Sequence, residues 1–261
     1  MDQTSLLTHR HDTPKSRFKS LFGYYGGKSK LAHLYPAPKY DVIIEPFAGG
    51  ASYSLRYYER NVHLYDADPI TADIWRFLLS PTALELCHKY IPKTAAAGDR
   101  ITDLLIPEAA DKYPGLLRLM QAEANCGTQG AKGIHNQVTS MAVKGWHRIL
   151  PKLDYWLPKI RHWRFVELPY SLLANCEATW FIDPPYNNEA GRRYRTQIGY
   201  DHTHLGLDYA ALGDWCRSRA GQVIVCENAG ATWLPFQPLA ERRGVMSSYQ
   251  KSRAMEVVYT Q

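Results

Sequence analysis

The sequence predicts an α/β fold with a parallel sheet, and two observations carry that prediction. Short apolar runs that stop at glycines or acids, at residues 40–47 and 61–69, alternate with stretches of helical spacing at 51–60 and 70–80. Such alternation is typical of parallel strands connected by helices. The 261 residues are 45% hydrophobic and 21% charged, which suits one globular unit with a sizeable core.

Beyond residue 80 the pattern changes and then returns. Helical stretches such as ALELCHKYI and YPGLLRLMQAEAN dominate residues 82–162, with little strand signal, and apolar strand patterns resume in HWRFVEL, ATWFID, GQVIVCEN and MEVVYTQ. We therefore expect an α/β domain over 18–81 and 163–261, interrupted by a mostly helical insertion over 82–162. Residues 1–17 are polar and without periodicity, so we expect a flexible leader there.

Composition excludes several classes of protein. No apolar run approaches the about 18 residues of a membrane span, and the N-terminal residues lack an apolar signal core. The five cysteines show no CxxC spacing and the ten histidines no HExxH motif. We therefore expect a cytoplasmic protein with free thiols, no bound metal and no membrane partner.

A basic stretch lies between residues 126 and 165 of this chain of net charge +6. Cations and aromatics together suit a polyanion with phosphates and stackable bases. A solvated face above a few core aromatics has the same composition, so charge alone leaves both interpretations open. The basic residues are Lys132, Lys144, Arg148, Lys152, Lys159, Arg161 and Arg164, and the aromatics are Trp146, Tyr155, Trp156 and Trp163.

The segment FGYYGGKSK, residues 22–30, ends like a phosphate-binding P-loop, with Gly27, Lys28 and Ser29. In the full motif G-x-x-x-x-G-K-[ST] the first glycine would fall at Phe22, and a buried strand would come before it. The residues that come before it here are basic. A P-loop NTPase is therefore the weakest interpretation.

A second glycine turn, Gly49 and Gly50, follows the strand pattern at 40–47. In open α/β sheets a ligand lies beyond the carboxyl end of the first strand, and an acid about 20 residues further on holds ribose hydroxyls. Asp66 follows Glu45 by 21 residues. The pattern indicates an adenosine-type cofactor, although a tight turn and a surface aspartate would also explain it.

The tetrapeptide Asp183-Pro184-Pro185-Tyr186 directly follows the apolar run TWFI. A buried strand would deliver the aspartate to the carboxyl edge of the sheet, and the two prolines would stiffen the backbone without donating N–H groups. A carboxylate, rigid carbonyls and a flat ring together suit an exocyclic amine on a planar base.

With these four motifs in order, the chain resembles the alpha group of the Dam-type (D12 class) adenine-N6 DNA methyltransferases, which use S-adenosylmethionine. FGYYGGK resembles that family's N-terminal element, EPFAGG its first glycine motif, LYDADP its strand-end acid and DPPY its catalytic tetrapeptide. The resemblance covers about residues 18–261. It implies a Rossmann-like methyltransferase sheet, with the insertion acting as a DNA-recognition subdomain.

The resemblance also implies roles for single residues in cofactor binding. Tyr24 would pack on S-adenosylmethionine and Lys28 would help to bind it, while Asp66 would hold the ribose hydroxyls. Pro169 stands where the family often has an acid for the cofactor's adenine, so Glu167 or the backbone would replace that acid. Three positions would line the methionine side: Glu45, Phe47 and Gly49.

In catalysis, the resemblance implies that the target adenine flips out of the duplex. Asp183, which would also face the cofactor, and the Pro184 carbonyl would accept hydrogen bonds from its amine. Pro185 would keep the turn rigid, and Tyr186 would stack on the base. Aspartate before PPY favours adenine over cytosine-N4 as the target. A DNA-binding protein without catalysis is a further alternative, which the intact tetrapeptide opposes.

The expected partner is double-stranded DNA, with single-stranded DNA as a further substrate, and we expect a monomer of bacterial or phage origin with short or relaxed specificity. Some polar residues have two interpretations, as base-reading side chains or as loop-stabilising amides: Asn125, Gln129 and Asn136. The arginines after DPPY would clamp phosphates, with a solvated loop as the alternative. Expected phosphate contacts are Arg192, Arg193, Arg195, Lys132, Lys144 and Arg148.

Overall fold

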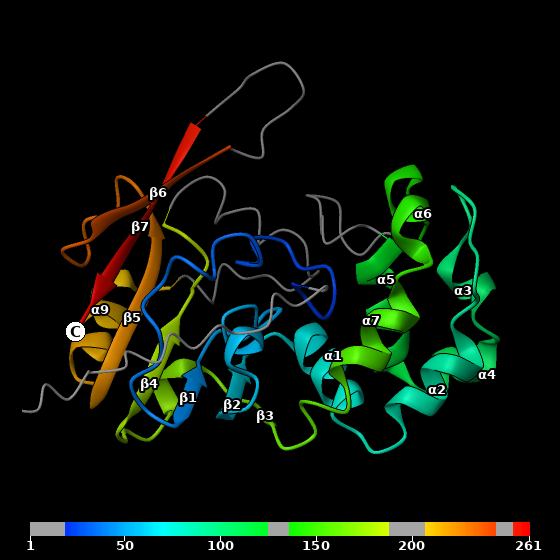
Figure 1. Cartoon of the computed structure of the whole chain (residues 1–261), viewed down its shortest axis with the longest axis horizontal. Helices are drawn as coiled ribbons and strands as arrows, with labels where there is room; N and C mark the ends of the chain where they lie inside the picture. The colour runs from blue at the N-terminus through cyan, green and yellow to red at the C-terminus, as the bar shows by residue number, and fades with distance from the viewer. Residues whose placement is uncertain (1–18, 125–135, 188–206, 244–252) are drawn as a thin grey trace, which may run out of the picture.

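The computed structural model describes residues 19–124, 136–187, 207–243 and 253–261. A twisted sheet forms one end of the molecule and a group of helices the other, with α1 between them (Figure 1). The leader expected at 1–17 lies outside the described residues. None of the described helices is long and apolar enough to cross a bilayer.

The described strands form one seven-stranded sheet in the order β3-β2-β1-β4-β5-β7-β6. Strands β1 to β5 run parallel, and β7 is antiparallel to both β5 and β6. The predicted Rossmann-like α/β fold, as expected for a methyltransferase, is therefore confirmed. The strands are β1 (Val42–Glu45), β2 (Asn61–Asp66), β3 (Arg164–Glu167), β4 (Ala178–Ile182), β5 (Gly221–Asn228), β6 (Gln237–Arg243) and β7 (Arg253–Thr260).

The strand order reverses between β1 and β4, and this switch point positions the site. All five residues of β4 are buried, as is typical of parallel strands covered on both faces. Ile44 of β1 pairs with Trp180 of β4, so both strands end at the same edge of the sheet. Glu45 and Asp183 therefore reach that edge, where open α/β sheets bind ligands.

The helices follow local sequence signals. Asp68 caps α1 by accepting hydrogen bonds from the Ile70 and Thr71 amides, and Pro69 occupies the first helical position. Residues 51–60 form only a short 3₁₀ turn, η1, in place of the predicted helix. The elements are η1 (Ser54–Tyr57), α1 (Pro69–Leu78), α2 (Ala83–Tyr90), α3 (Ile101–Leu104), α4 (Pro107–Lys112), α5 (Pro114–Ala124), α6 (Ser140–Trp146), α7 (Ile149–Trp156), η2 (Tyr170–Leu172) and α9 (Tyr209–Arg217).

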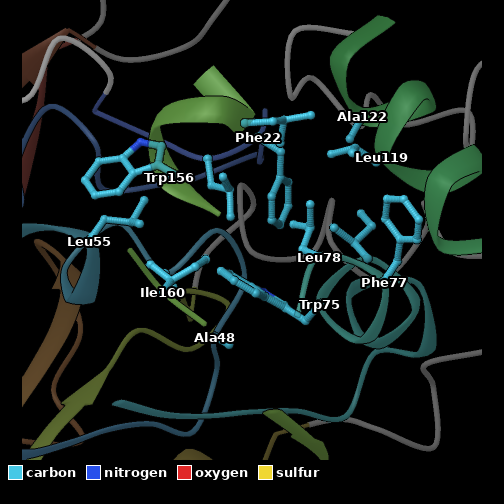
Figure 2. Close-up of a cluster of buried hydrophobic side chains, with 14 of the residues drawn as sticks. Phe22, Ala48, Leu55, Trp75, Phe77, Leu78, Leu119, Ala122, Trp156 and Ile160 are labelled. Carbon is cyan, nitrogen blue, oxygen red and sulfur yellow. The ribbon is translucent and has the colours of Figure 1, made fainter. Parts of the chain in front are cut away.

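The helices α2 to α7 fall within residues 82–162, and they share a hydrophobic core with the sheet domain. Figure 2 shows Trp75 and Leu78 of α1 in one cluster with Leu119 of α5 and Trp156 of α7. Helices α1 and α5 approach closely because Gly115 has no Cβ, which would lie 2.2 Å from a backbone oxygen of α1. The insertion is thus packed directly on the sheet domain.

Burial decides between the two interpretations for the three tryptophans of the basic stretch, whereas Tyr155 is half-buried. Trp146, Trp156 and Trp163 are 3%, 1% and 4% exposed. The indole N–H of Trp146 donates to the Pro92 carbonyl, and that of Trp163 donates to the Tyr58 carbonyl. These three rings are therefore core residues and offer no stacking surface to bases.

Candidate functional site

A cavity of about 210 Å³ lies at the carboxyl edge of β1, β2 and β4. Residues from all four motifs line it, although the motifs are spread from the N-terminal loop to the end of β4. The seven positions expected to bind a cofactor are all among the lining residues: Tyr24, Lys28, Glu45, Phe47, Gly49, Asp66 and Asp183.

The turn after β1 needs glycine for two reasons. Gly49 has φ of +44°, in the left-handed region, and a Cβ there would lie 2.6 Å from the Tyr24 ring. Its N–H donates to Asp66 Oδ2 at 3.0 Å, and its carbonyl accepts from the Trp75 indole at 2.8 Å. The turn is thereby fixed to β2 and α1, with Tyr24 packed against it.

Asp66 ends β2 at the floor of the cavity and is 9% exposed. Its Oδ1 accepts from the Asp68 amide at 3.0 Å, and its Oδ2 from Gly49. Burial and the nearby Asp68 carboxylate raise its pKa to about 7, against the lowering effect of the backbone N–H bonds. Asp66 therefore changes charge near neutral pH.

Glu45 is 2% exposed, and its Oε1 accepts a hydrogen bond from the Ser54 amide at 2.9 Å. Burial raises the pKa of this carboxyl to about 8, and hydrogen bonds from Ser54 only partly offset the effect. At pH 7 Glu45 is therefore mostly protonated and can donate as well as accept a hydrogen bond.

Lys28 connects the first and last motifs. Its ammonium lies 2.5 Å from Asp183 Oδ1, donates to the Gly26 carbonyl at 3.2 Å, and is 3.9 Å from Glu256 Oε1. Burial lowers the pKa of Lys28, but Asp183, Glu256 and Cys226 raise it, and the net shift is upward. Lys28 therefore stays charged in the interior.

The residues after Asp183 are placed differently from one another. Pro184 is buried, whereas Pro185 lines the cavity and its carbonyl accepts from the Tyr209 hydroxyl at 2.6 Å. The Pro185 carbonyl therefore joins the tetrapeptide to α9, whereas the carbonyl expected to accept from the amine is that of Pro184. Tyr186 is 8% exposed, its hydroxyl donates to Glu256, and the Lys28 ammonium lies 4.7 Å from its ring centroid.

The cavity wall around Pro169, the position that departs from the pattern of the resembled family, is aromatic. Pro169 and Tyr170 line it, and the Tyr170 ring lies 5.4 Å from that of Phe47 at an angle of 31°. Glu167 instead pairs with Arg76 at 2.5 Å, so its carboxylate is engaged outside the cavity. Sequence reasoning missed Tyr170 and Tyr209, because an isolated tyrosine carries no motif.

A partly buried carboxylate connects the insertion to the N-terminal loop. Glu123 of α5 accepts the Gly23 amide at 2.9 Å and the Lys152 ammonium at 2.7 Å through the same oxygen. Both side chains of this ion pair are about one-eighth exposed, at 13% and 12%. Lys152 is therefore part of the loop's support and is not simply a surface cation.

The residues expected to contact DNA are only partly described. Lys144 and Arg148 are exposed near the end of α6, whereas other candidates lie outside the described residues. The Asn136 side chain bonds to the amide and hydroxyl of Thr102, at 3.2 and 2.8 Å, which makes it a loop-stabilising amide. The candidates outside the described residues are Lys132, Arg192, Arg193, Arg195, Asn125 and Gln129.

No protein-family model matches the chain, and no curated protein matches it. Among solved structures it is similar to a "conserved hypothetical protein" of Streptococcus pyogenes, with TM-score 0.31 and 9% identity, over 83% of this chain and 84% of that one. It is also similar to the "Putative methyltransferase yhhF from Escherichia coli", with TM-score 0.28 and 11% identity, over 83% and 73%. Similarities this low carry no conclusion about ligand or reaction. Those conclusions depend on this chain's own residues.

Proposed function

We propose that the chain transfers a methyl group from S-adenosylmethionine to the N6 amine of a flipped-out adenine in DNA. The 2.5 Å contact between Lys28 and Asp183 carries the proposal. It joins FGYYGGK to DPPY across 155 residues, in a cavity that EPFAGG and LYDADP also line. Four motifs that resemble one family's motifs in sequence order thus converge on one site.

The chemistry of the lining residues fits S-adenosylmethionine. Asp66 offers carboxylate oxygens suited to a ribose diol, and each oxygen can accept a second hydrogen bond beside the backbone bond it already has. Phe47, which the resemblance placed on the methionine side, packs against Tyr170, and the two rings together form an apolar wall suited to an adenine ring. Glu45 and Asp183 supply acidic groups near Tyr24 and Lys28. When bound, S-adenosylmethionine supplies an electrophilic methyl group.

Asp183 has the central role in this proposal. Its carboxylate is 20% exposed, so it reaches the cavity while its Oδ1 is held by Lys28. The lone pair of an adenine amine is delocalised into the ring, and a hydrogen bond to a carboxylate strengthens the amine as a nucleophile. Lys28 orients the Asp183 carboxylate, and holding the amine and the methyl donor together in the right geometry supplies up to about 7–11 kcal/mol of a barrier in favourable cases.

DNA as the substrate is supported by charge and by the tetrapeptide. Net charge is +6, the exposed Lys144 and Arg148 lie on the insertion, and Arg148 lines a hollow together with Lys19 and Gly23 of the N-terminal loop. Aspartate rather than serine before PPY favours adenine over cytosine. Base flipping is part of the proposal because a target amine inside a duplex is out of reach of the cavity.

The test is transfer of tritium from methyl-labelled S-adenosylmethionine to unmodified DNA, followed by digestion to nucleosides. We expect label on N6-methyladenosine. Label on N4-methylcytosine would move the proposal to the other exocyclic amine. Absence of transfer by a chain that binds DNA would refute the enzyme proposal.

A matched pair of variants tests the role of Asp183. We expect Asp183→Asn to abolish transfer and to leave most of the DNA affinity, because its carboxyl acts on the amine and does not contact phosphates. Asp111→Asn removes an exposed carboxylate on α4 and should leave both unchanged. If Asp183→Asn loses DNA binding to the same degree as transfer, the assigned role is wrong.

A further inference from the structure

A fully buried carboxylate, Glu256 of β7, lies behind the catalytic tetrapeptide. Its exposed fraction is 0%, and its Oε1 accepts hydrogen bonds from the hydroxyls of Tyr35, at 2.7 Å, and Tyr186. The Lys28 ammonium lies 3.9 Å from the same oxygen. One oxygen of Glu256 thus connects Tyr35, Tyr186 and Lys28, and the hydrogen bonds that a carboxylate accepts from hydroxyls are stronger than neutral ones.

A second buried carboxylate holds the next residue of the same turn. Glu227 of β5 is 1% exposed, and its Oε2 accepts from the Asn187 amide and the Trp233 indole, both at 3.1 Å. In the pairing of β5 with β7, Glu256 lies opposite Asn228, one residue away from Glu227. Because side chains alternate along a strand, Glu227 and Glu256 lie on opposite faces of the sheet.

The two carboxylates therefore hold the turn after β4 from both faces. Glu256 fixes the hydroxyl end of Tyr186, and Glu227 fixes the backbone one residue further on. Asp183 lies at the start of this turn and is bonded to Lys28, which Glu256 also attracts. A small shift at Glu256 would move the ring of Tyr186 and the Lys28 ammonium together, and with them Asp183.

We propose that Glu256 is a positioning residue that, with Glu227, clamps the DPPY turn and sets the direction of the Asp183 carboxylate. The inference rests on the proposed methyl transfer and adds to it two acids from the far end of the chain. It also gives the Tyr186 hydroxyl a task separate from ring stacking. Glu256 itself acts through Tyr186 and Lys28.

The test is a double-mutant cycle in methyl transfer. Tyr186→Phe keeps the buried ring and removes the hydroxyl that binds Glu256, whereas Glu256→Gln keeps the shape and removes the charge. We expect each variant to lower kcat about 100-fold, as misplacement of reacting groups does, with a KM for DNA within about threefold of the wild-type value. The double variant should be no slower than the worse single variant. Tyr259→Phe, on the same strand but bonded to Gln261, is the matched control and should be neutral.

Each outcome decides a different point. If wild type and Tyr186→Phe transfer equally fast, the clamp is wrong and the methyltransferase proposal stands. If the wild type transfers nothing, the proposed function fails and takes the catalytic role of the clamp with it. If Glu256→Gln does not fold, Tyr35→Phe replaces it in the cycle. This change removes one hydrogen bond to the Glu256 carboxylate and leaves the carboxylate itself in place. If the effects of Tyr35→Phe and Tyr186→Phe on the rate of methyl transfer are then additive, the inference is overturned.

Discussion

Replacing Lys28 by methionine tests whether the ion pair with Asp183 holds the cavity together. Methionine has a similar length and apolar stem, so the change removes the charge with little change in volume. Lys28 is 6% exposed, and its ammonium is shared between Asp183 and Glu256. Without the ammonium, the carboxylates of Asp183 and Glu256 lose the cation that they share.

The geometry sets the size of the effect. At an effective dielectric constant of about 20, unit charges 2.5 Å apart interact by about 7 kcal/mol. Desolvation of the ammonium and water around Asp183, which is 20% exposed, offset much of this energy. Removing one partner of a buried pair costs about 3–5 kcal/mol, and the exposure of Asp183 favours the lower end. We expect Lys28→Met to lower the free energy of unfolding by about 3 kcal/mol.

The assay is urea denaturation followed by circular dichroism, with tritium transfer measured on the same samples. Lys30→Met changes an exposed lysine of the same loop and should stay within about 0.5 kcal/mol of wild type. Adding Asp183→Asn to Lys28→Met should recover about 1–2 kcal/mol, because the unpaired charge is gone. A loss below about 1 kcal/mol, or no recovery in the double variant, would refute the reasoning.

Four further predictions concern the cavity and its support. Because the pKa of Asp66 is about 7, S-adenosylhomocysteine should bind about tenfold more tightly at pH 8 than at pH 6 by calorimetry, and Asp66→Asn should flatten this dependence. The same raised pKa makes the ligand-free chain less stable in urea as the pH rises from 3.8 towards 7, because the folded state then keeps a proton that the unfolded state loses. Gly115→Ala should cost about 2 kcal/mol of unfolding free energy, whereas Gly145→Ala, with nothing within 4 Å, should add about 0.5–1 kcal/mol. Glu123→Gln should weaken S-adenosylhomocysteine binding about fivefold, since it loses about 1 kcal/mol of charged hydrogen bonding to the N-terminal loop, and an unchanged affinity would contradict that role.

The central strands were predictable because burial on both faces leaves a continuous apolar run, as in β4. Strand β6 was not, because QPLAERR is polar and contains Pro238, which an edge strand tolerates. Its strand conformation comes from pairing with β7, which no local pattern announces. The opposite error occurs at residues 51–60. Their spacing predicts a helix, but only the short η1 forms, because the glycine turn directly before them constrains the backbone.

The same distinction between local sequence patterns and contacts made only in the folded chain applies to the candidate site. Residues within the four motifs could be named in advance because their spacing repeats a known order, and the structure brings their side chains to one cavity. Glu256 carries no motif and lies 70 residues from Tyr186, so its partnership exists only after the sheet has formed. In the basic stretch, composition predicted a binding surface and a set of core aromatics equally well. Composition does not distinguish a buried tryptophan such as Trp156 from an exposed one.

The charge balance of the cavity connects these residues to the proposed cofactor. Among the described residues that line it, four are acids, namely Glu45, Asp66, Asp68 and Asp183, and Lys28 is the single lysine or arginine. Burial is the main cause that raises the pKa of Glu45 and Asp66 towards neutrality, and the nearby carboxylates of Asp183 and Asp68 raise it further. A ligand with a positive centre offsets that excess. A sulfonium has such a centre and the thioether left after methyl transfer does not, so the same acids that favour binding of the substrate also favour release of the product.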